Sequence, residues 1–241
     1  MTRVPAKTLF LILSIFLLVA GARAADDSVP FIVNKGQCDR TVQFYARTFG
    51  GTVFVDDNGE IRYLLHPTDA ADPIELIVTE QFLGKAKPGL RGKGQAVTNI
   101  GFFKNQGLHQ WTSYVPTYDL IDIDSICTGV SITLSAYENT FEKRFEIEAG
   151  SDPRGLEIRV EPATGLAVTT SGDLTLETDA GQVRFIAPVA LQVDGGRTKH
   201  VDISYVLSGD QYHFSLGKRD PLLPTTIITR TRVIEPVESL K

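Results

Sequence analysis

The sequence predicts an all-β protein, arranged as an antiparallel β-sandwich with little helix. Short runs rich in β-branched and aromatic residues recur from residue 31 to residue 233. Gly, Pro, Asn, Asp and Ser separate these runs, as turns between antiparallel strands require. No stretch of eleven or more residues keeps a 3.6-residue apolar period, so long helices are not expected. Two packed sub-sandwiches are the alternative arrangement for a chain of this length.

The expected strands follow one another along the whole chain. In chain order they cover residues 42–47, 52–55, 60–66, 73–79, 97–103, 113–121, 130–137, 141–147, 156–161, 166–170, 174–177, 183–186, 189–193, 201–207, 212–216 and 225–233. Asp56–Gly59 places Asp and Asn before Gly, which indicates a hairpin turn rather than a calcium loop. Apolar and polar residues alternate in 174–178, as in a strand with one face on the core. In 141–147 the alternation is imperfect.

The domain organisation expected from these patterns is a single module over residues 25–224. The polar, Gly- and Lys-rich segment 84–95 interrupts the strands and is interpreted as an internal linker or long loop. Residues 225–241 form a C-terminal strand and tail. Their β-rich part, 225–233, either closes the fold as a last strand, which we favour, or is an edge that pairs with a partner.

The first 24 residues predict a secretory signal peptide that is cleaved after Ala24. Arg3 and Lys7 give a positive start, Leu9–Ala20 is apolar apart from Ser14, and Ala22–Ala24 supplies small residues at the cleavage site. Twelve residues reach only about 18 Å as a helix, well short of a bilayer's hydrocarbon core of ~30 Å. We therefore expect an exported protein, periplasmic or extracellular, without stable membrane insertion after cleavage.

The charge balance argues against nucleic acid and anionic lipid as partners. Residues 1–24 hold three basic residues and no acidic one, so cleavage would bring the formal net charge from −5 to −8. An acidic surface of this kind repels polyanions. The local basic group is Lys85, Lys87, Arg91 and Lys93, which is either a solvated loop or a docking site for an acidic glycan or partner.

Both cysteines, Cys38 and Cys127, lie in the exported part and form a candidate disulfide. An oxidising compartment favours pairing of an even number of cysteines. Closing a loop of about 90 residues would contribute roughly 4–5 kcal/mol in the chain-entropy model. Two separately buried thiols are the alternative.

The sequence predicts no catalytic residues, metal ligands or cofactor. The four histidines, His66, His109, His200 and His213, lack metal-ligand spacing, and nucleophile-elbow and phosphate-loop motifs are missing. The densest acidic group is Asp119, Asp122 and Asp124. Because strand residues three apart face opposite sides, we interpret this group as a solvated edge rather than a catalytic pair.

Three aromatic residues suggest a possible binding surface for sugar rings. Trp111, Tyr114 and Tyr118 fall in one β-rich stretch. Aromatic side chains of this kind either form an exposed platform or pack in a sandwich core, where they bury the largest apolar area. We favour core packing.

Several segments form a characteristic series in chain order: Phe31–Gln37, Val42–Arg47, Gly50–Gly51, Phe54, Trp111–Tyr118, Phe145–Pro153, Gly172–Leu174, Ala187–Val189 and Asp220–Leu223. In this order they resemble the N-terminal all-β module of bacterial secreted proteins that carry SBBP (beta-propeller) repeats or gliding-motility-type sorting domains. The resemblance spans about residues 31–224. Cys38 and Cys127 fall where the family's pattern has other residues. The resemblance implies that propeller repeats or a sorting domain follow the module, whereas this sequence ends at Lys241.

The resemblance implies a β-sandwich module of unknown biochemical role, without established catalytic residues. Together with the predicted export, it leads us to expect a non-enzymatic interaction or accessory module of the bacterial cell envelope, whose partner is an envelope or surface protein or a glycan. A carbohydrate-binding module, or a carbohydrate-active hydrolase that uses paired carboxylates, is the alternative.

Overall fold

The computed structural model describes residues 28–65, 76–84, 87–96, 100–103, 111–162, 165–178 and 181–234, and within them almost every element is a strand. The predicted signal peptide lies outside the described residues. The strands are β1 (Phe31–Val33), β2 (Val42–Thr48), β3 (Gly51–Asp56), β4 (Ile61–Leu65), β5 (Leu76–Phe82), β6 (Gly89–Gln95), β7 (Ile100–Phe103), β8 (Trp111–Val115), β9 (Thr117–Cys127), β10 (Val130–Tyr137), β11 (Thr140–Ile147), β12 (Ile158–Glu161), β13 (Leu166–Val168), β14 (Leu174–Thr178), β15 (Gly181–Phe185), β16 (Val189–Asp194), β17 (Arg197–Val201), β18 (Ile203–Ser208), β19 (Gln211–Leu216) and β20 (Thr225–Ile234). A 3₁₀ turn covers Pro153–Gly155. No described segment is a helix long and apolar enough to cross a membrane.

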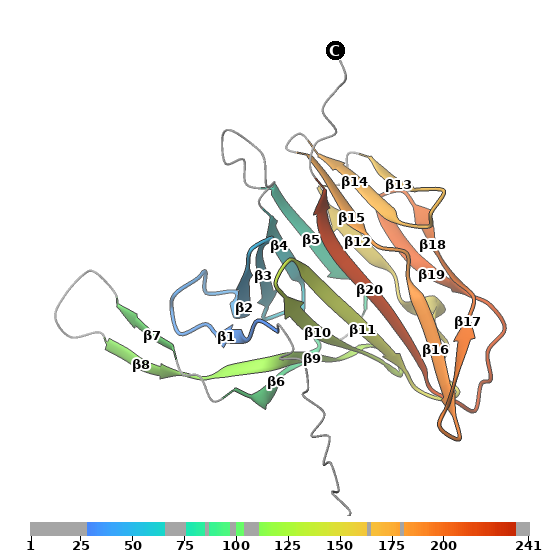
Figure 1. Cartoon of the computed structure of the whole chain (residues 1–241), viewed down its shortest axis with the longest axis horizontal. Coiled ribbons are helices and arrows are strands. Elements are labelled where there is room, and N and C mark those ends of the chain that lie inside the picture. Colours follow the sequence, from blue (N-terminus) through green and yellow to red (C-terminus); the bar gives the residue numbers. More distant parts are fainter. Residues whose placement is uncertain are drawn as a thin grey trace, which may run out of the picture.

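Apart from β7 and β8, which form a separate two-stranded sheet, the described strands pair antiparallel in one long, strongly curved sheet (Figure 1). From one end its order is β18, β19, β12, β5, β4, β3, β2, β1, β9, β10, β11, β20, β15, β14 and β13. The end strands β13 and β18 approach each other, so the sheet is nearly closed and barrel-like. The predicted all-β antiparallel class is confirmed, whereas a two-layer sandwich is not.

The sequence predicts an internal linker or long loop over residues 84–95. This prediction is wrong for Gly89–Gln95, which form strand β6 and pair with β9. The sequence lacks strand alternation here because the side chains of β6 are mostly exposed. Gly92 has a specific role, since a Cβ at this position would lie 2.3 Å from the ring of Tyr118. The segment is therefore polar because the strand is exposed, and it has a glycine at position 92 because the ring of Tyr118 packs against the backbone there.

Strand β20 lies inside the sheet and is not a detachable edge. Its Thr225–Thr231 part pairs with β11 on one side, and β16 and β15 pair with successive parts of its other side. This pairing agrees with the favoured interpretation of residues 225–233 as a last strand that closes the fold, and not with the alternative of an edge that pairs with a partner; the strand runs to Ile234. The remaining residues, 235–241, lie outside the described part.

The turn predicted at Asp56–Gly59 joins β3 to β4 as expected. The backbone N–H of Gly59 donates to the carbonyl oxygen of Asp56 at 2.9 Å. Gly59 has φ +85°, a conformation that costs a residue with a Cβ free energy. The hairpin is thus set by the glycine, as the sequence predicts.

Side chains from opposite walls of the curved sheet fill its interior. Alternate residues of each strand point inward, for example Val53 and Val55 on β3 and Ile132 and Leu134 on β10, and these four are fully buried. They belong to one contiguous cluster that reaches most strands of the sheet. A second, smaller cluster lies between β1 and β2. The interior is therefore a packed core, as in small barrels.

Candidate functional site

Of the three aromatic residues predicted as a platform or as core, the structure describes the side chain of Tyr118 alone. Tyr118 is half-buried and packs against the main core, and its ring meets that of Phe44 edge-on at a centroid distance of 6.1 Å. Trp111 and Tyr114 lie on β8, and their side chains fall outside the described part of the structure. The one described member thus has a packing role.

The predicted acidic and basic groups face each other across the pair β6–β9. Arg91 lies 2.6 Å from Asp124, and Lys93 lies 3.7 Å from Asp122. Lys87 reaches Asp57 at 3.4 Å, while Lys85 is outside the described residues. Cross-strand opposite charges of this kind stabilise strand pairing by roughly 0.2–1 kcal/mol per pair. The basic group is therefore largely neutralised by acids of the same chain.

The predicted disulfide is not present, because both cysteines are free thiols. Cys38 packs against the small cluster between β1 and β2, whereas Cys127 packs against the main core. Burial raises the pKa of each thiol above its usual value, and at Cys38 the cations Arg47 and Arg62 partly oppose this. The alternative of two separate, partly buried thiols describes the structure.

The described histidines lie apart from one another. His200 is exposed on β17 and His213 is half-buried on β19, while His66 and His109 lie outside the described residues. Within the part that the structure describes, no three His, Cys, Asp or Glu side chains gather in a way that would hold a metal ion.

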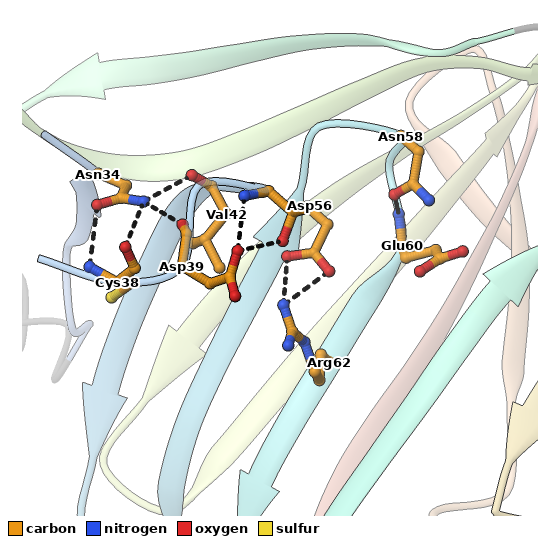
Figure 2. A network of polar contacts seen from close by, with 9 residues as sticks. Asn34, Cys38, Asp39, Val42, Asp56, Asn58, Glu60 and Arg62 are labelled. Atoms are coloured by element: carbon orange, nitrogen blue, oxygen red, sulfur yellow. Dashed lines mark hydrogen bonds and ion pairs between the residues drawn. The ribbon is translucent and has the colours of Figure 1, made fainter. Parts of the chain in front are cut away.

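Asn34 organises the loop between β1 and β2, as Figure 2 shows. Its Oδ1 accepts the backbone N–H groups of Gly36, Gln37 and Cys38 at 2.9–3.1 Å. Its Nδ2 donates to the carbonyl oxygens of Asp39 and Val42 at 2.7 and 2.9 Å. One side chain thus holds much of the backbone of this loop, from Gly36 to Val42.

The neighbouring turn is fixed by an ion pair next to this loop (Figure 2). Both carboxylate oxygens of Asp56 accept from Nη2 of Arg62 at 2.7 and 2.8 Å. The backbone N–H of Asp57 donates to the carbonyl oxygen of Thr41 at 2.7 Å, which ties the turn to the loop. These contacts are made within the chain, so this network has a structural role.

A second polar cluster lies deep in the core and consists of Tyr63 on β4, Glu80 on β5, Lys143 on β11 and Tyr212 on β19. All four side chains are fully buried. Nζ of Lys143 donates to both carboxylate oxygens of Glu80, at 2.5 Å to Oε1. The hydroxyl of Tyr63 donates to Oε2 at 2.8 Å, and that of Tyr212 donates to Oε1 at 2.6 Å. We call these residues the core quartet.

The surroundings of the core quartet are apolar and aromatic. Nζ of Lys143 lies 4.9 Å from the ring centroid of Phe185. Burial lowers the pKa of Lys143 below its ordinary value, although the Glu80 carboxylate opposes this. Burial and the same carboxylate raise the pKa values of Tyr63 and Tyr212 well above the usual range. Both tyrosines therefore remain protonated donors.

Sequence reasoning did not identify the core quartet, but it contained one signal. The imperfect alternation in 141–147 arises because Lys143 lies on the buried face between Phe141 and Phe145. With Lys143 counted as an interior residue, the inward face is continuous through Ile147. A lysine at an apolar position of a strand thus indicated a buried cation, and only the fold reveals its partner.

An aliphatic stripe is exposed on the outer face of β16. Val189 and Val193 are 43% and 57% exposed, and Leu191 lies between them on the same face. Ile228 of β20 stands opposite Val189 and extends the stripe. We call Val189, Leu191, Val193 and Ile228 the β16 stripe. Charged residues border the β16 stripe. Arg144 on β11 is the cross-strand neighbour of Ile228, and it forms an ion pair with Glu142.

A shallow depression of about 530 Å³ lies beside the 3₁₀ turn, next to His213 and Arg219. Arg154 at its rim donates to both carboxylate oxygens of Asp152, which lowers the pKa of that carboxyl to about 2. Arg219 donates to the carbonyl oxygen of Ser151. Both cations in this depression are therefore engaged within the chain.

Comparison with known proteins identifies a family but no characterised relative. No curated protein matches the chain, and no solved structure matches it either. Residues 31–227, which run from β1 into β20, match the family described as Domain of unknown function (DUF7948). The chain belongs to this family.

Proposed function

We propose that the protein is an exported, non-enzymatic interaction module of the bacterial cell envelope, and that it binds a protein partner through the β16 stripe. The first 24 residues support export, because they have the three-part layout of a signal peptide. The packed interior supports a role for the outer surface, since side chains from both walls occupy the space that a ligand inside the sheet would need.

The exposed β16 stripe is the observation that carries the proposal. Aliphatic side chains in the centre with charged residues at the border are the usual composition of a protein interface. Three of its members lie on alternate positions of one strand, so they present a continuous apolar surface. Val193, the most exposed of them, faces solvent at the outer end of β16.

The chemistry of the stripe favours a protein over a glycan. Sugar rings bind flat against aromatic faces, whereas the stripe is built from Val, Leu and Ile. The ribbon β16–β17 adds a second element to this surface. Among the described strands, β17 pairs only with β16, and its edge carries exposed Arg197, Thr198 and Lys199. An extended segment of a partner can add to such an edge while its apolar side chains cover the stripe.

The proposal also includes the kind of protein that the module binds. Its resemblance to modules of secreted proteins with SBBP repeats or sorting domains supports a position beside other extracellular or envelope domains. The partner would then be another exported protein that carries such domains.

The test is affinity capture of the mature chain from native envelope extract, with one substitution in the stripe. Val193→Asp places a charge in the stripe, and Val168→Asp is the control, because Val168 is a comparably exposed valine on β13. The proposal predicts an envelope protein that co-purifies with the wild type and the control and is depleted at least tenfold with Val193→Asp. Equal recovery with all three chains, or recovery of polysaccharide alone, would overturn it.

A further inference from the structure

We propose that Lys143 and Glu80 become joined by an intramolecular amide bond between Nζ and Cδ, formed after folding by the core quartet itself. The bond would connect β5 to β11 across the interior, and so would link two walls of the sheet covalently. This modification is independent of the proposed binding function.

The geometry places the nucleophile against the carbon that it would attack. Nζ of Lys143 contacts both carboxylate oxygens of Glu80, so it lies beside the Cδ atom that carries them. Attack then requires Nζ to approach Cδ from above the carboxylate plane. Both side chains are fully buried and held by strands of the same rigid core. Reactive groups fixed in this way reach effective molarities of about 10⁵–10⁸ M in well-oriented intramolecular reactions.

The surroundings favour the uncharged forms that the reaction requires. An amine must be neutral to attack, and a carboxyl group must be protonated for its oxygen to leave as water. Burial lowers the pKa of Lys143, which promotes transfer of its proton to the carboxylate. A buried ion pair carries a large desolvation cost, and an amide does not. The apolar rings around Nζ, such as Phe185, therefore favour the product.

The two tyrosines are positioned for separate roles at the two oxygens. The hydroxyl of Tyr63 donates to Oε2, which becomes the amide oxygen, and so stabilises the negative charge that develops there. The hydroxyl of Tyr212 donates to Oε1 at 2.6 Å and also accepts from Nζ at 3.4 Å. It can therefore pass a proton from the attacking nitrogen to the departing oxygen.

The atoms balance without any further reactant. The Nζ lone pair of Lys143 forms the bond to Cδ of Glu80, and the bond from Cδ to Oε1 breaks. Oε1 leaves as water, carrying its own proton and the proton that Tyr212 relays from Nζ. Nitrogen and carbon keep their oxidation states in this condensation, so no oxidant or reductant takes part.

Peptide mapping by mass spectrometry tests the proposal on the full chain purified in folded form. The expected result is a branched peptide that joins the segments containing Glu80 and Lys143 and is lighter than their sum by one water. Chain kept in denaturant from synthesis onward should lack it. Separate, unmodified Glu80 and Lys143 peptides from the folded protein would overturn the proposal.

Variants separate the roles of the residues. Lys143→Met should abolish the branched peptide, and Lys199→Met, at an exposed lysine of β17, should retain it. Tyr212→Phe keeps the ring and removes the relay, so formation should slow by about a hundredfold or more. A Tyr212→Phe protein that cross-links at the wild-type rate would contradict the relay. If that variant does not fold, the peptide map of the wild-type protein still decides whether the bond exists.

Discussion

Glu80 on β5 and Lys143 on β11 meet across the interior of the sheet, although they lie 63 positions apart in the sequence. The residues two positions away on the same face of each strand are apolar and point into the same core. Val78 is such a neighbour of Glu80, and Phe145 is such a neighbour of Lys143. Two hydroxyl donors complete the carboxylate's contacts. The pair thus connects opposite walls at the centre of the fold.

Removing the cation of this pair should destabilise the fold strongly. Lys143→Met leaves the Glu80 carboxylate buried without its cation, which typically costs about 3–5 kcal/mol of unfolding free energy relative to the intact ion pair, and loss of the proposed amide adds to this cost. Arg144→Met is the matched control on the same strand, because its side chain is 50% exposed and surface pairs contribute only about 0–1 kcal/mol. Urea unfolding monitored by circular dichroism measures both. Equal midpoints for the two variants would contradict a structural role for the pair.

Buried tyrosines should make the protein sensitive to alkaline pH. Burial, followed by Cys38, raises the pKa of Tyr45 to about 12, and the pKa values of Tyr63, Tyr205 and Tyr212 are raised as well. These phenols stay protonated in the folded state and ionise near pH 10 in the unfolded chain. Their contribution to stability is therefore complete below about pH 10 and is lost as pH rises toward 12.

Thermal unfolding as a function of pH, together with the ultraviolet absorbance of phenolate, measures this effect. Unfolding temperature should fall steeply above about pH 10, and phenolate should appear at these tyrosines only as the protein unfolds. Titration of all tyrosines near their ordinary pKa in a protein that stays folded would contradict the prediction.

Asn34 should be the most sensitive polar residue of the N-terminal loop. Asn34→Asp keeps the acceptor for three N–H groups but replaces the amide donor with an oxygen that faces the carbonyls of Asp39 and Val42. The free energy of unfolding is expected to fall by about 1–3 kcal/mol, because the two carbonyls lose their hydrogen-bond donor. Asn58→Asp is the control, because the Asn58 side chain accepts from the Glu60 N–H alone. Similar melting temperatures for both variants would argue against the role assigned to Asn34.

Gly92 should be required for the pairing of β6 with β9. Gly92→Ala places a methyl group 2.3 Å from the Tyr118 ring, so ring or strand must move. Gly155→Ala is the control, since its Cβ would meet nothing within 4 Å. Hydrogen exchange of the β6 amides should rise in the first variant and stay unchanged in the second. Unchanged protection in Gly92→Ala would show that β6 is not held in this register.

Both cysteines should be free in the folded protein, in contrast to the pairing predicted from the sequence. Alkylation without prior reduction, followed by mass spectrometry, should label Cys38 and Cys127 slowly at neutral pH, because burial raises both thiol pKa values. In the companion measurement the protein is unfolded without reductant, and both cysteines should then be labelled rapidly. A peptide linked by Cys38 and Cys127 would contradict the structure.

Local patterns predicted the strands well, and the reasons are visible in particular elements. The hairpin at Asp56–Gly59 depends on a glycine with positive φ, and the runs at 130–137 and 212–216 coincide with β10 and β19. Three strands were missed, Phe31–Val33, Gly89–Gln95 and Arg197–Val201. The first is only three residues long, too short to show a period. The other two are mostly exposed edges, so neither carries the apolar alternation on which strand prediction depends.

The arrangement of strands and the core quartet could not be predicted from one sequence. β5 and β11 face each other across the interior only through closure of the sheet, and nothing local pairs Glu80 with Lys143. The same is true of β20, whose position between β11 on one side and β15 and β16 on the other depends on long-range pairing. Local periodicity predicts which face of a strand is buried, but it does not predict which residues lie opposite that face.

Site-specific photocrosslinking in the native envelope tests the proposed binding function most directly. A photoreactive residue is placed at Val193 in the β16 stripe and, in a second chain, at Val168 on β13. The proposal predicts a discrete covalent adduct with one envelope protein from position 193 and none from position 168. An absence of adducts at position 193, or the same adduct from both positions, would contradict it.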